Sequence, residues 1–139
     1  MTGASLYMLD TNIVSHMMRE PLGVASQRVL DANASMQASR VCTSVIVLCE
    51  LQFGLRRRTH ARWATHYQRV MADLEVAPLT SSVAKHYAEL RTHLESAGLS
   101  IGSNDTLIAA HALALDAVLV SADLAFRHVP ALKLENWLA

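Results

Sequence analysis

The sequence has only two cysteines, Cys42 and Cys49, and neither lies in a CxxC pair or in a cluster of cysteine and histidine. This absence argues against a disulfide scaffold and a cysteine-based zinc site. We expect both thiols to be buried apolar residues of a protein from a reducing compartment. None of the seven histidines forms an HExxH pair, so a histidine-based metal site is not indicated either.

Long uncharged segments and an excess of one charge are also missing. Runs such as 106–115 are much shorter than the roughly 20 apolar residues that span a membrane. The apolar run at 6–9 follows no basic segment of the kind found in signal peptides, so we expect a cytoplasmic protein without a membrane segment. The formal net charge is zero, and any attraction to nucleic acid must therefore be local.

The sequence does contain a large apolar fraction, spread over short segments. With 139 residues, 52% of them hydrophobic, the chain has the size of one domain, and we treat residues 1–139 as a single domain. Short apolar runs predict strands at 6–9, 40–43, 74–79, 118–121 and 133–135. Helical segments are expected from about 14 to a break at 21–23, over 24–33, from 45, over 57–73, from 80 or 81 to 98, and from 103 to about 115.

The alternation of strands and helices predicts an α/β fold with a parallel sheet covered on both faces. The carboxyl ends of such strands meet at one edge, where active sites form. Four acidic residues stand where an apolar segment stops or a helix begins: Asp10, Glu50, Asp105 and Asp123. Two carboxylates about 4 Å apart repel by roughly 4 kcal/mol, and Mg²⁺ or Mn²⁺, which prefer oxygen ligands, remove that cost. The pattern predicts a metal-dependent enzyme with an acidic pocket.

Each acid also has an ordinary structural interpretation. Asp10 could cap the helix that follows it, although the next two residues could do so equally well. Glu50 could face water at a helix edge, Asp105 could complement the dipole of its helix, and Asp123 could start a turn. The hypothesis of an acidic site therefore depends on the four residues together.

One stretch of the chain, from Leu51 to Ala72, has several arginines and no acid. Trp63 and Tyr67 are interleaved among them, as in a helix that holds an RNA backbone and stacks on bases. Alternatively, the helix is solvated with its aromatic rings toward the core, or it meets an acidic stretch of a partner protein. The arginines considered for RNA binding are Arg56, Arg57, Arg58 and Arg62.

Other protein classes with an acid after the first strand require residues that this chain lacks. Phosphatases of the DxD type need a second Asp at position 12, where the chain has Asn12. A receiver domain needs an acidic pair before its Asp, and a P-loop or dinucleotide fold needs a glycine-rich turn. None of these signatures is present in the sequence.

Five segments in fixed order carry a resemblance to a known family. They are 7–13 around Asp10, 43–54 around Glu50, 101–111 around Asp105, 118–123 ending at Asp123, and 129–137. The set covers nearly the whole chain and resembles the PIN-domain ribonucleases, among them the VapC-type toxins of bacterial toxin–antitoxin pairs. The resemblance implies a three-layer α/β/α fold with a mostly parallel central sheet.

The resemblance also assigns roles to individual residues. The four acids take the family's acidic positions, with Asp10 and Asp105 as the main metal ligands and the other two holding metal or its water. Thr11 and Ser44 take neighbouring hydroxyl positions, where they would orient carboxylates or water. Asn12 matches the first motif as a structural turn residue.

The implied reaction is hydrolysis of an RNA phosphodiester bond with one or two Mg²⁺ or Mn²⁺ ions and activated water. Toxins of this class often cut a tRNA in its anticodon stem-loop, and the segments at 101–102 and 135–137 resemble those of toxins that cut initiator tRNA. The resemblance further implies a homodimer that is neutralised by a cognate VapB-like antitoxin. The alternative is a catalytically silent PIN-like module that binds RNA or protein.

Overall fold

The computed structural model describes residues 5–35, 39–58 and 60–139. The strands are β1 (Leu6–Leu9), β2 (Arg40–Ser44), β3 (Glu75–Ala77), β4 (Val118–Val120) and β5 (Lys133–Glu135). The helices are α1 (Thr11–Arg19), α2 (Val24–Asn33), α3 (Val45–Arg57), α4 (Ala61–Met71), α5 (Ser82–Ser96), α6 (Ser103–Ala114) and the 3₁₀ helix η1 (Leu124–His128). All five predicted strands are present, and helices separate them along the chain.

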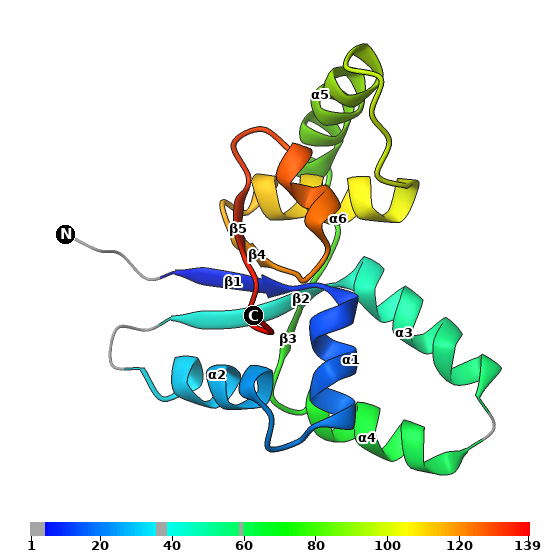
Figure 1. Ribbon diagram of the computed structural model, residues 1–139, viewed down its shortest axis with the longest axis vertical. Coiled ribbons are helices and arrows are strands. Elements are labelled where there is room, and N and C mark those ends of the chain that lie inside the picture. The colour runs from blue at the N-terminus through cyan, green and yellow to red at the C-terminus, as the bar shows by residue number, and fades with distance from the viewer. Residues whose placement is uncertain (1–4, 36–38, 59) are drawn as a thin grey trace.

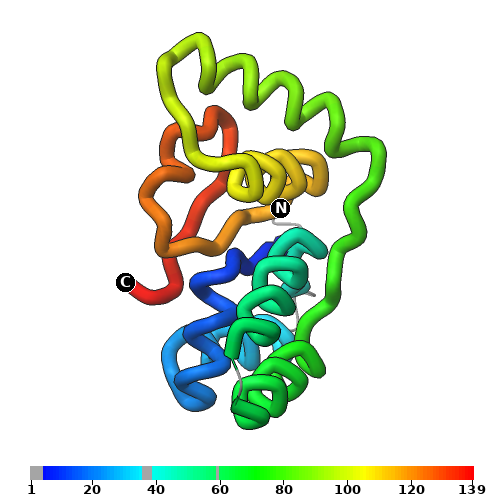
Figure 2. The backbone as a smooth tube through the Cα atoms, turned by 90° about the vertical axis from the view of Figure 1, so that its right-hand side faces the viewer, coloured from blue at the N-terminus to red at the C-terminus, as the bar shows by residue number. Residues whose placement is uncertain are grey.

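The five strands run parallel in one sheet with the order β3-β2-β1-β4-β5. Two views at right angles show α5 and α6 on one side of the sheet and α1, α2 and α4 on the other (Figure 1, Figure 2). This arrangement confirms the three-layer α/β/α fold expected from the sequence. No helix in the described part of the chain has the length and apolar character needed to cross a membrane.

The central strands are apolar because helices cover both of their faces. Met8 and Leu9 of β1 and Leu119 and Val120 of β4 are fully buried. Thr43, near the end of β2, is also fully buried, and its hydroxyl donates a hydrogen bond of 2.7 Å to the carbonyl of Leu9. That bond satisfies the hydroxyl and fastens the carboxyl ends of β1 and β2 to each other.

Helix α3 starts where the sequence predicted and extends to Arg57. It begins after Ser44, which caps it as expected. The prediction of one helix over 57–73 is therefore wrong at its start, because the next helix begins only at Ala61. Basic side chains in the last turn of α3 favour this extension, since they complement the carbonyl end of the helix dipole. Figure 1 shows α3 projecting past the carboxyl edge of the sheet.

The two cysteines have different environments, and the expectation that both are buried is wrong for one of them. Cys42 on β2 is buried, and burial raises the pKa of its thiol to about 12. Cys49 on α3 is exposed. Val47 and Leu51 face the core one helical turn apart, so Cys49, midway between them, lies on the opposite side of the helix.

Candidate active site

Neighbouring strands bring the first and the last motifs of the chain together. Leu9 pairs with Thr43 of β2 and with Val120 of β4 in adjacent parallel ladders. The residues that follow these strands, Asp10 and Ser121 among them, therefore emerge side by side at the carboxyl edge of the sheet. The backbone N–H of Asp10 donates to the carbonyl of Val120 over 2.9 Å, which extends this contact beyond the strand.

Asp10 is the most buried of the four predicted acids, with 4% of its surface exposed. Its Oδ2 accepts a hydrogen bond of 2.7 Å from the Ser121 hydroxyl and one of 3.1 Å from Asn12 Nδ2. Asp10 occupies the N-cap position of α1, but within the described structure its carboxylate makes no capping hydrogen bond. Two side-chain donors orient the carboxylate instead, so helix capping does not explain why an aspartate stands at position 10.

Asn12 and Ser121 connect the start of α1 to the loop after β4. Asn12 donates to Ser121 Oγ over 3.1 Å and accepts from the N–H of Ala122 over 3.0 Å. Ser121 Oγ also accepts from the N–H of Asp123 over 3.0 Å. Asp123 is exposed, and its Oδ1 caps η1 by accepting from the N–H of Ala125 over 2.9 Å. One carboxylate oxygen of Asp123 therefore has the structural role that the turn interpretation gives it.

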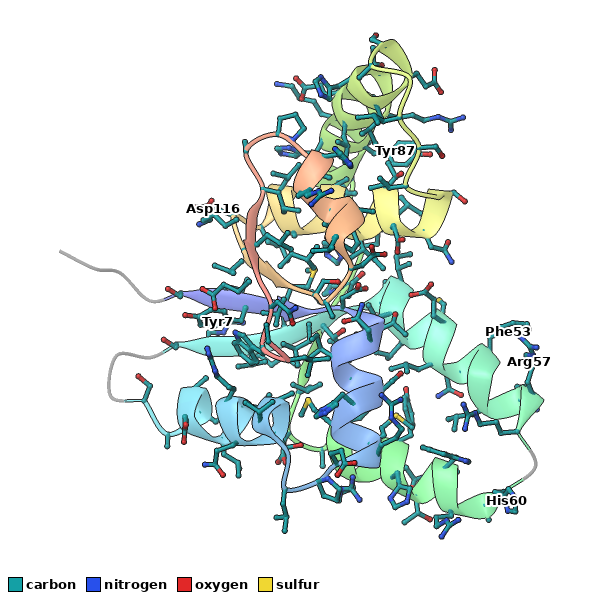
Figure 3. All side chains as sticks on the ribbon, viewed as in Figure 1. Tyr7, Phe53, Arg57, His60, Tyr87 and Asp116 are labelled. Atoms are coloured by element: carbon teal, nitrogen blue, oxygen red, sulfur yellow. The ribbon has the colours of Figure 1, made fainter. Side chains whose placement is uncertain are left out.

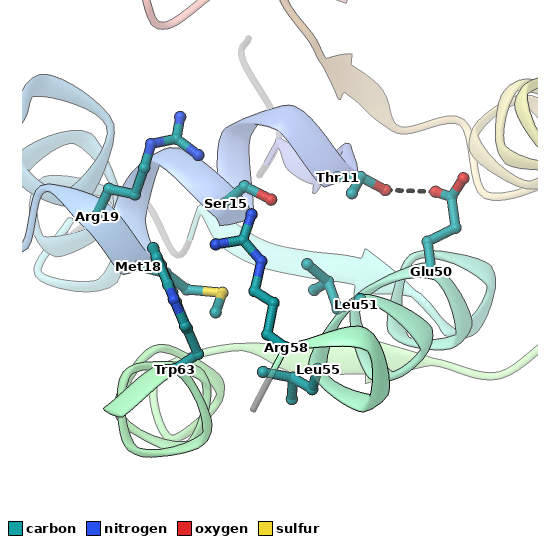
Figure 4. A pocket seen from close by; sticks show the side chains of 10 residues that line it. Thr11, Ser15, Met18, Arg19, Glu50, Leu51, Leu55, Arg58 and Trp63 are labelled. Carbon is teal, nitrogen blue, oxygen red and sulfur yellow. Dashed lines mark hydrogen bonds between the residues drawn. The ribbon is translucent and has the colours of Figure 1, made fainter. Parts of the chain in front are cut away.

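Glu50 lies on α3 and is partly exposed at the same edge of the sheet. The Thr11 hydroxyl donates a hydrogen bond to Glu50 Oε1, from the first turn of α1 across to α3 (Figure 4). A hydroxyl in this position fixes the orientation of the carboxylate. Since Thr11 directly follows Asp10, one short segment of chain positions two of the four acids.

Ser44 bonds to a histidine. Its Oγ accepts from the N–H of Ile46 over 3.1 Å and lies 2.8 Å from His111 Nδ1. His111 is buried on α6; burial lowers its pKa, and a hydrogen bond with the backbone of Pro78 opposes that shift. A neutral ring whose Nε2 donates a hydrogen bond to the Pro78 carbonyl can accept a hydrogen bond from the Ser44 hydroxyl at Nδ1. Through these bonds Ser44 fixes the start of α3, which carries Glu50, against α6.

Asp105 stands in the first turn of α6 and is partly exposed. Burial, and then the negative charges of Asp10, Asp123 and Glu50, raise its pKa from 3.8 to about 6. Burial likewise raises the pKa of Asp10, hydrogen bonds oppose that shift, and the charges of Glu50 and Asp123 add to it. These mutual effects place the four acids in one electrostatic cluster, here called the acidic cluster.

The acidic cluster offers carboxylate oxygens, which suit a hard divalent cation. Among residues 5–35, 39–58 and 60–139, however, no three His, Cys, Asp or Glu side chains are grouped closely enough to hold a metal ion by themselves. The cluster is therefore open. Mg²⁺ is commonly held by one or two carboxylates together with water and substrate phosphate, and an open cluster fits that mode of binding.

The arginines considered for RNA binding differ in where they lie. Arg58 lines a cavity of about 220 Å³ that reaches the acidic cluster, and its guanidinium carbon lies 4.5 Å from the ring centre of Trp63. Arg57 lies on the outer side of α3 beside Phe53, with 5.5 Å between its guanidinium carbon and the ring centre (Figure 3). The other two arginines are exposed and do not line that cavity.

Three residues of the site were not predicted from the sequence. Ser121 could have been found from strand register, because it follows β4 as Asp10 follows β1. His111 lies inside a recognised motif, but only the fold shows that it meets Ser44. Arg19 lines the same cavity as Arg58 from the far end of α1, and no motif or spacing signals it.

Comparison with known proteins identifies the class to which this fold and site belong. A model of the PIN domain matches residues 7–132, and the chain belongs to the PIN-domain family. The "Ribonuclease VapC2" of Rickettsia felis is 36% identical to it, over 95% of this chain and 98% of the relative. The "tRNA(fMet)-specific endonuclease VapC" of Salmonella typhimurium is 28% identical, over 94% and 97%. A crystal structure of VapBC2 from Rickettsia felis, bound to a DNA fragment from its promoter, superimposes with a TM-score of 0.87 and 35% identity, over 95% of this chain and 98% of that one.

Proposed function

We propose that this protein is a metal-dependent endoribonuclease toxin that cuts RNA at the acidic cluster of Asp10, Glu50, Asp105 and Asp123. The observation that carries the proposal is the convergence of acids at the carboxyl edge of the sheet, where Ser121 and Asn12 hold Asp10 and Thr11 holds Glu50. Keeping the carboxylates of Asp10 and Asp105 buried or partly buried beside other acids raises their pKa and costs free energy, and a bound cation relieves that cost. When bound, Mg²⁺ or Mn²⁺ would polarise the phosphate and activate the attacking water.

The side chains around the cluster orient the carboxylates for this task. Ser121 and Asn12 both donate to Oδ2 of Asp10 and so fix the direction of its other oxygen. Thr11 holds one oxygen of Glu50 in the same way. Asp105 serves as the second main ligand, and Asp123 contributes the oxygen that does not cap η1. Preset ligands of this kind lose little conformational entropy when the ion and the substrate arrive.

The proposed substrate is a tRNA, cut in its anticodon stem-loop. Support comes from the Salmonella typhimurium relative, which is named as specific for tRNA(fMet). Arg56, Arg57, Arg58 and Arg62 would contribute to binding through contacts with the RNA backbone, as a concentration of positive charge at the end of α3 and the start of α4.

The proposed partner is a cognate VapB-like antitoxin, which neutralises a homodimer of this chain. The similarity to VapBC2 over nearly the full length supports an assembly of this kind. The competing function is that of a silent PIN-like module that binds RNA or protein without cutting. The four intact acids and the raised pKa values favour the enzyme.

The test is cleavage of total cellular RNA by purified protein free of antitoxin, in Mg²⁺, in Mn²⁺ and in EDTA. Wild type, Asp10→Asn and Asp73→Asn are compared, and the cut ends are mapped by sequencing. Asp73 is an exposed acid outside the cluster and serves as the matched control. Discrete cuts that need metal and Asp10, and that persist in Asp73→Asn, support the proposal. No cutting by folded wild-type protein in either metal would favour the silent binding module.

A further inference from the structure

A cavity of about 220 Å³ lies between α1, α3 and α4 and opens beside the acidic cluster (Figure 4). Thr11 and Glu50 form one end of it. Arg19, Arg58 and Trp63 line the other end. The cavity thus runs from a negative end, where the proposed reaction occurs, to a positive end.

Within the described residues, the positive end of the cavity has no neutralising ion pair. Neither Arg19 nor Arg58 forms an ion pair within the part of the protein that the structure describes. Among the described residues that line the cavity, Glu50 is the one acid, and one of its oxygens already accepts a hydrogen bond from the Thr11 hydroxyl. Two arginines that line one end of a cavity without an ion pair give that end a positive charge, which a bound anion would neutralise.

The position of Arg58 suits the binding of a phosphate. It is the C-cap residue of α3, in extended conformation, and Figure 4 shows its side chain reaching from there toward Ser15 of α1. The guanidinium lies 4.5 Å from the ring centre of Trp63. A guanidinium over an aromatic ring keeps its N–H groups free at the edge, where a phosphate can bind in bidentate fashion. The Ser15 hydroxyl on the opposite wall adds one more donor.

We propose that Arg19 and Arg58 bind a phosphate of the RNA that flanks the one being cut, on the Glu50 side of the acidic cluster. This inference rests on the proposed function, because it takes RNA as the substrate. A phosphodiester chain carries a negative charge at each nucleotide, so a phosphate held at the acidic cluster has charged neighbours on the strand that can enter the adjoining cavity. The cavity leads directly from Glu50 to the two arginines and provides the path for that neighbour. The site adds Arg19 to the RNA contacts and distinguishes Arg58 from the arginines outside the cavity.

The binding test uses Asp10→Asn protein, which we expect to bind RNA without cutting it, and a fluorescein-labelled single-stranded RNA carrying the mapped cut site. Fluorescence anisotropy gives the affinity at a series of KCl concentrations. The double variant Arg19→Gln/Arg58→Gln is expected to lower the slope of log K against log[salt] by about 0.7, the value for one phosphate contact on a single strand, and each single variant should lower it by part of that amount. Arg40→Gln is the matched control, since Arg40 is exposed at the opposite, amino-terminal end of β2 and forms a surface pair with Glu75.

A cleavage assay with the acids intact separates this inference from the proposed function. Arg19→Gln and Arg58→Gln should reduce kcat/KM by about tenfold, largely through KM, because a flanking contact holds substrate and transition state alike. If wild-type protein cuts no RNA, the proposed function fails first. If wild type cuts and both variants match Arg40→Gln in salt slope and kcat/KM, the phosphate site is overturned while the nuclease stands. If both variants bound RNA as well as wild type but bound the antitoxin more weakly, the phosphate site would also be overturned, and the cavity would be a protein-binding site. Arg19 is exposed, so Arg19→Gln alone decides the question if Arg58→Gln does not fold.

Discussion

Asp105→Asn should stabilise the metal-free protein near neutral pH, although it removes a proposed metal ligand. Asp105 has a pKa of about 6 in the folded protein against an ordinary value of 3.8. One pKa unit corresponds to about 1.4 kcal/mol, so this gap amounts to roughly 3 kcal/mol. Because the carboxylate is partly exposed, solvent screening reduces the expected effect to about 1–2 kcal/mol. An asparagine keeps the shape of the side chain and removes the repulsion from the other acids.

The raised pKa of Asp105 also makes the stability of the protein depend on pH. A carboxylate whose folded pKa is raised binds more protons in the native state than in the unfolded state between pH 3.8 and about 6. The contribution of Asp105 to the free energy of unfolding is therefore greatest below pH 3.8 and is lost as the pH rises through 6. In wild-type protein this group favours stability at pH 4.5 over pH 7.5, and Asp105→Asn should remove that difference.

The assay is urea denaturation followed by circular dichroism, in EDTA, at pH 7.5 and pH 4.5. Asp73→Asn is the matched control, because Asp73 is an exposed acid outside the cluster and its replacement should change stability by less than about 0.5 kcal/mol. A variant Asp105→Asn that is less stable than wild type at pH 7.5, or equally pH-dependent, would refute the reasoning. Such a result would mean that the Asp105 carboxylate stabilises the fold.

Two further predictions concern the metal and the support of α3. Mg²⁺ should raise the Tm of wild-type protein and leave the Tm of Asp10→Asn unchanged, because an ion stabilises the native state only if its ligands are intact. An equal rise in Tm for the two proteins would show that Asp10 does not bind the metal. Ser44→Ala should cost about 1 kcal/mol through the lost cap, and His111→Leu about 1–3 kcal/mol through unpaired polar groups. The two losses should be less than additive in the double variant, measured by urea denaturation, and strict additivity would show that the Ser44–His111 bond contributes nothing.

Local patterns in the sequence were sufficient for most of the secondary structure. The apolar run at 6–9 ending at Asp10, the cap at Ser44 and the break at 21–23 depend only on near neighbours, and the structure has all three. The start of α4 and the exposure of Cys49 were predicted wrongly. Whether a helix continues past a weak boundary, and which of its faces is covered, depends on what packs against it.

The sequence also indicated which acids to consider, but it left each with an ordinary interpretation. The contacts between distant residues decide among these interpretations. Asp10 does not cap its helix and is bonded to Ser121, whereas Asp123 does cap η1. The Thr11–Glu50 and Ser44–His111 bonds likewise join separate helices or strands.

The sequence by itself determined the alternation of strands and helices and the order of the acidic motifs, because propensity, capping and hydrophobic period act over a few residues. Only the tertiary structure decided which side chains share a space. Strand order β2-β1-β4 brings residues near the two ends of the chain together, and the packing of α1, α3 and α4 brings Arg19 and Arg58 to one cavity. These juxtapositions follow from burying the apolar faces of all elements at once, a condition on the whole chain that no local segment contains.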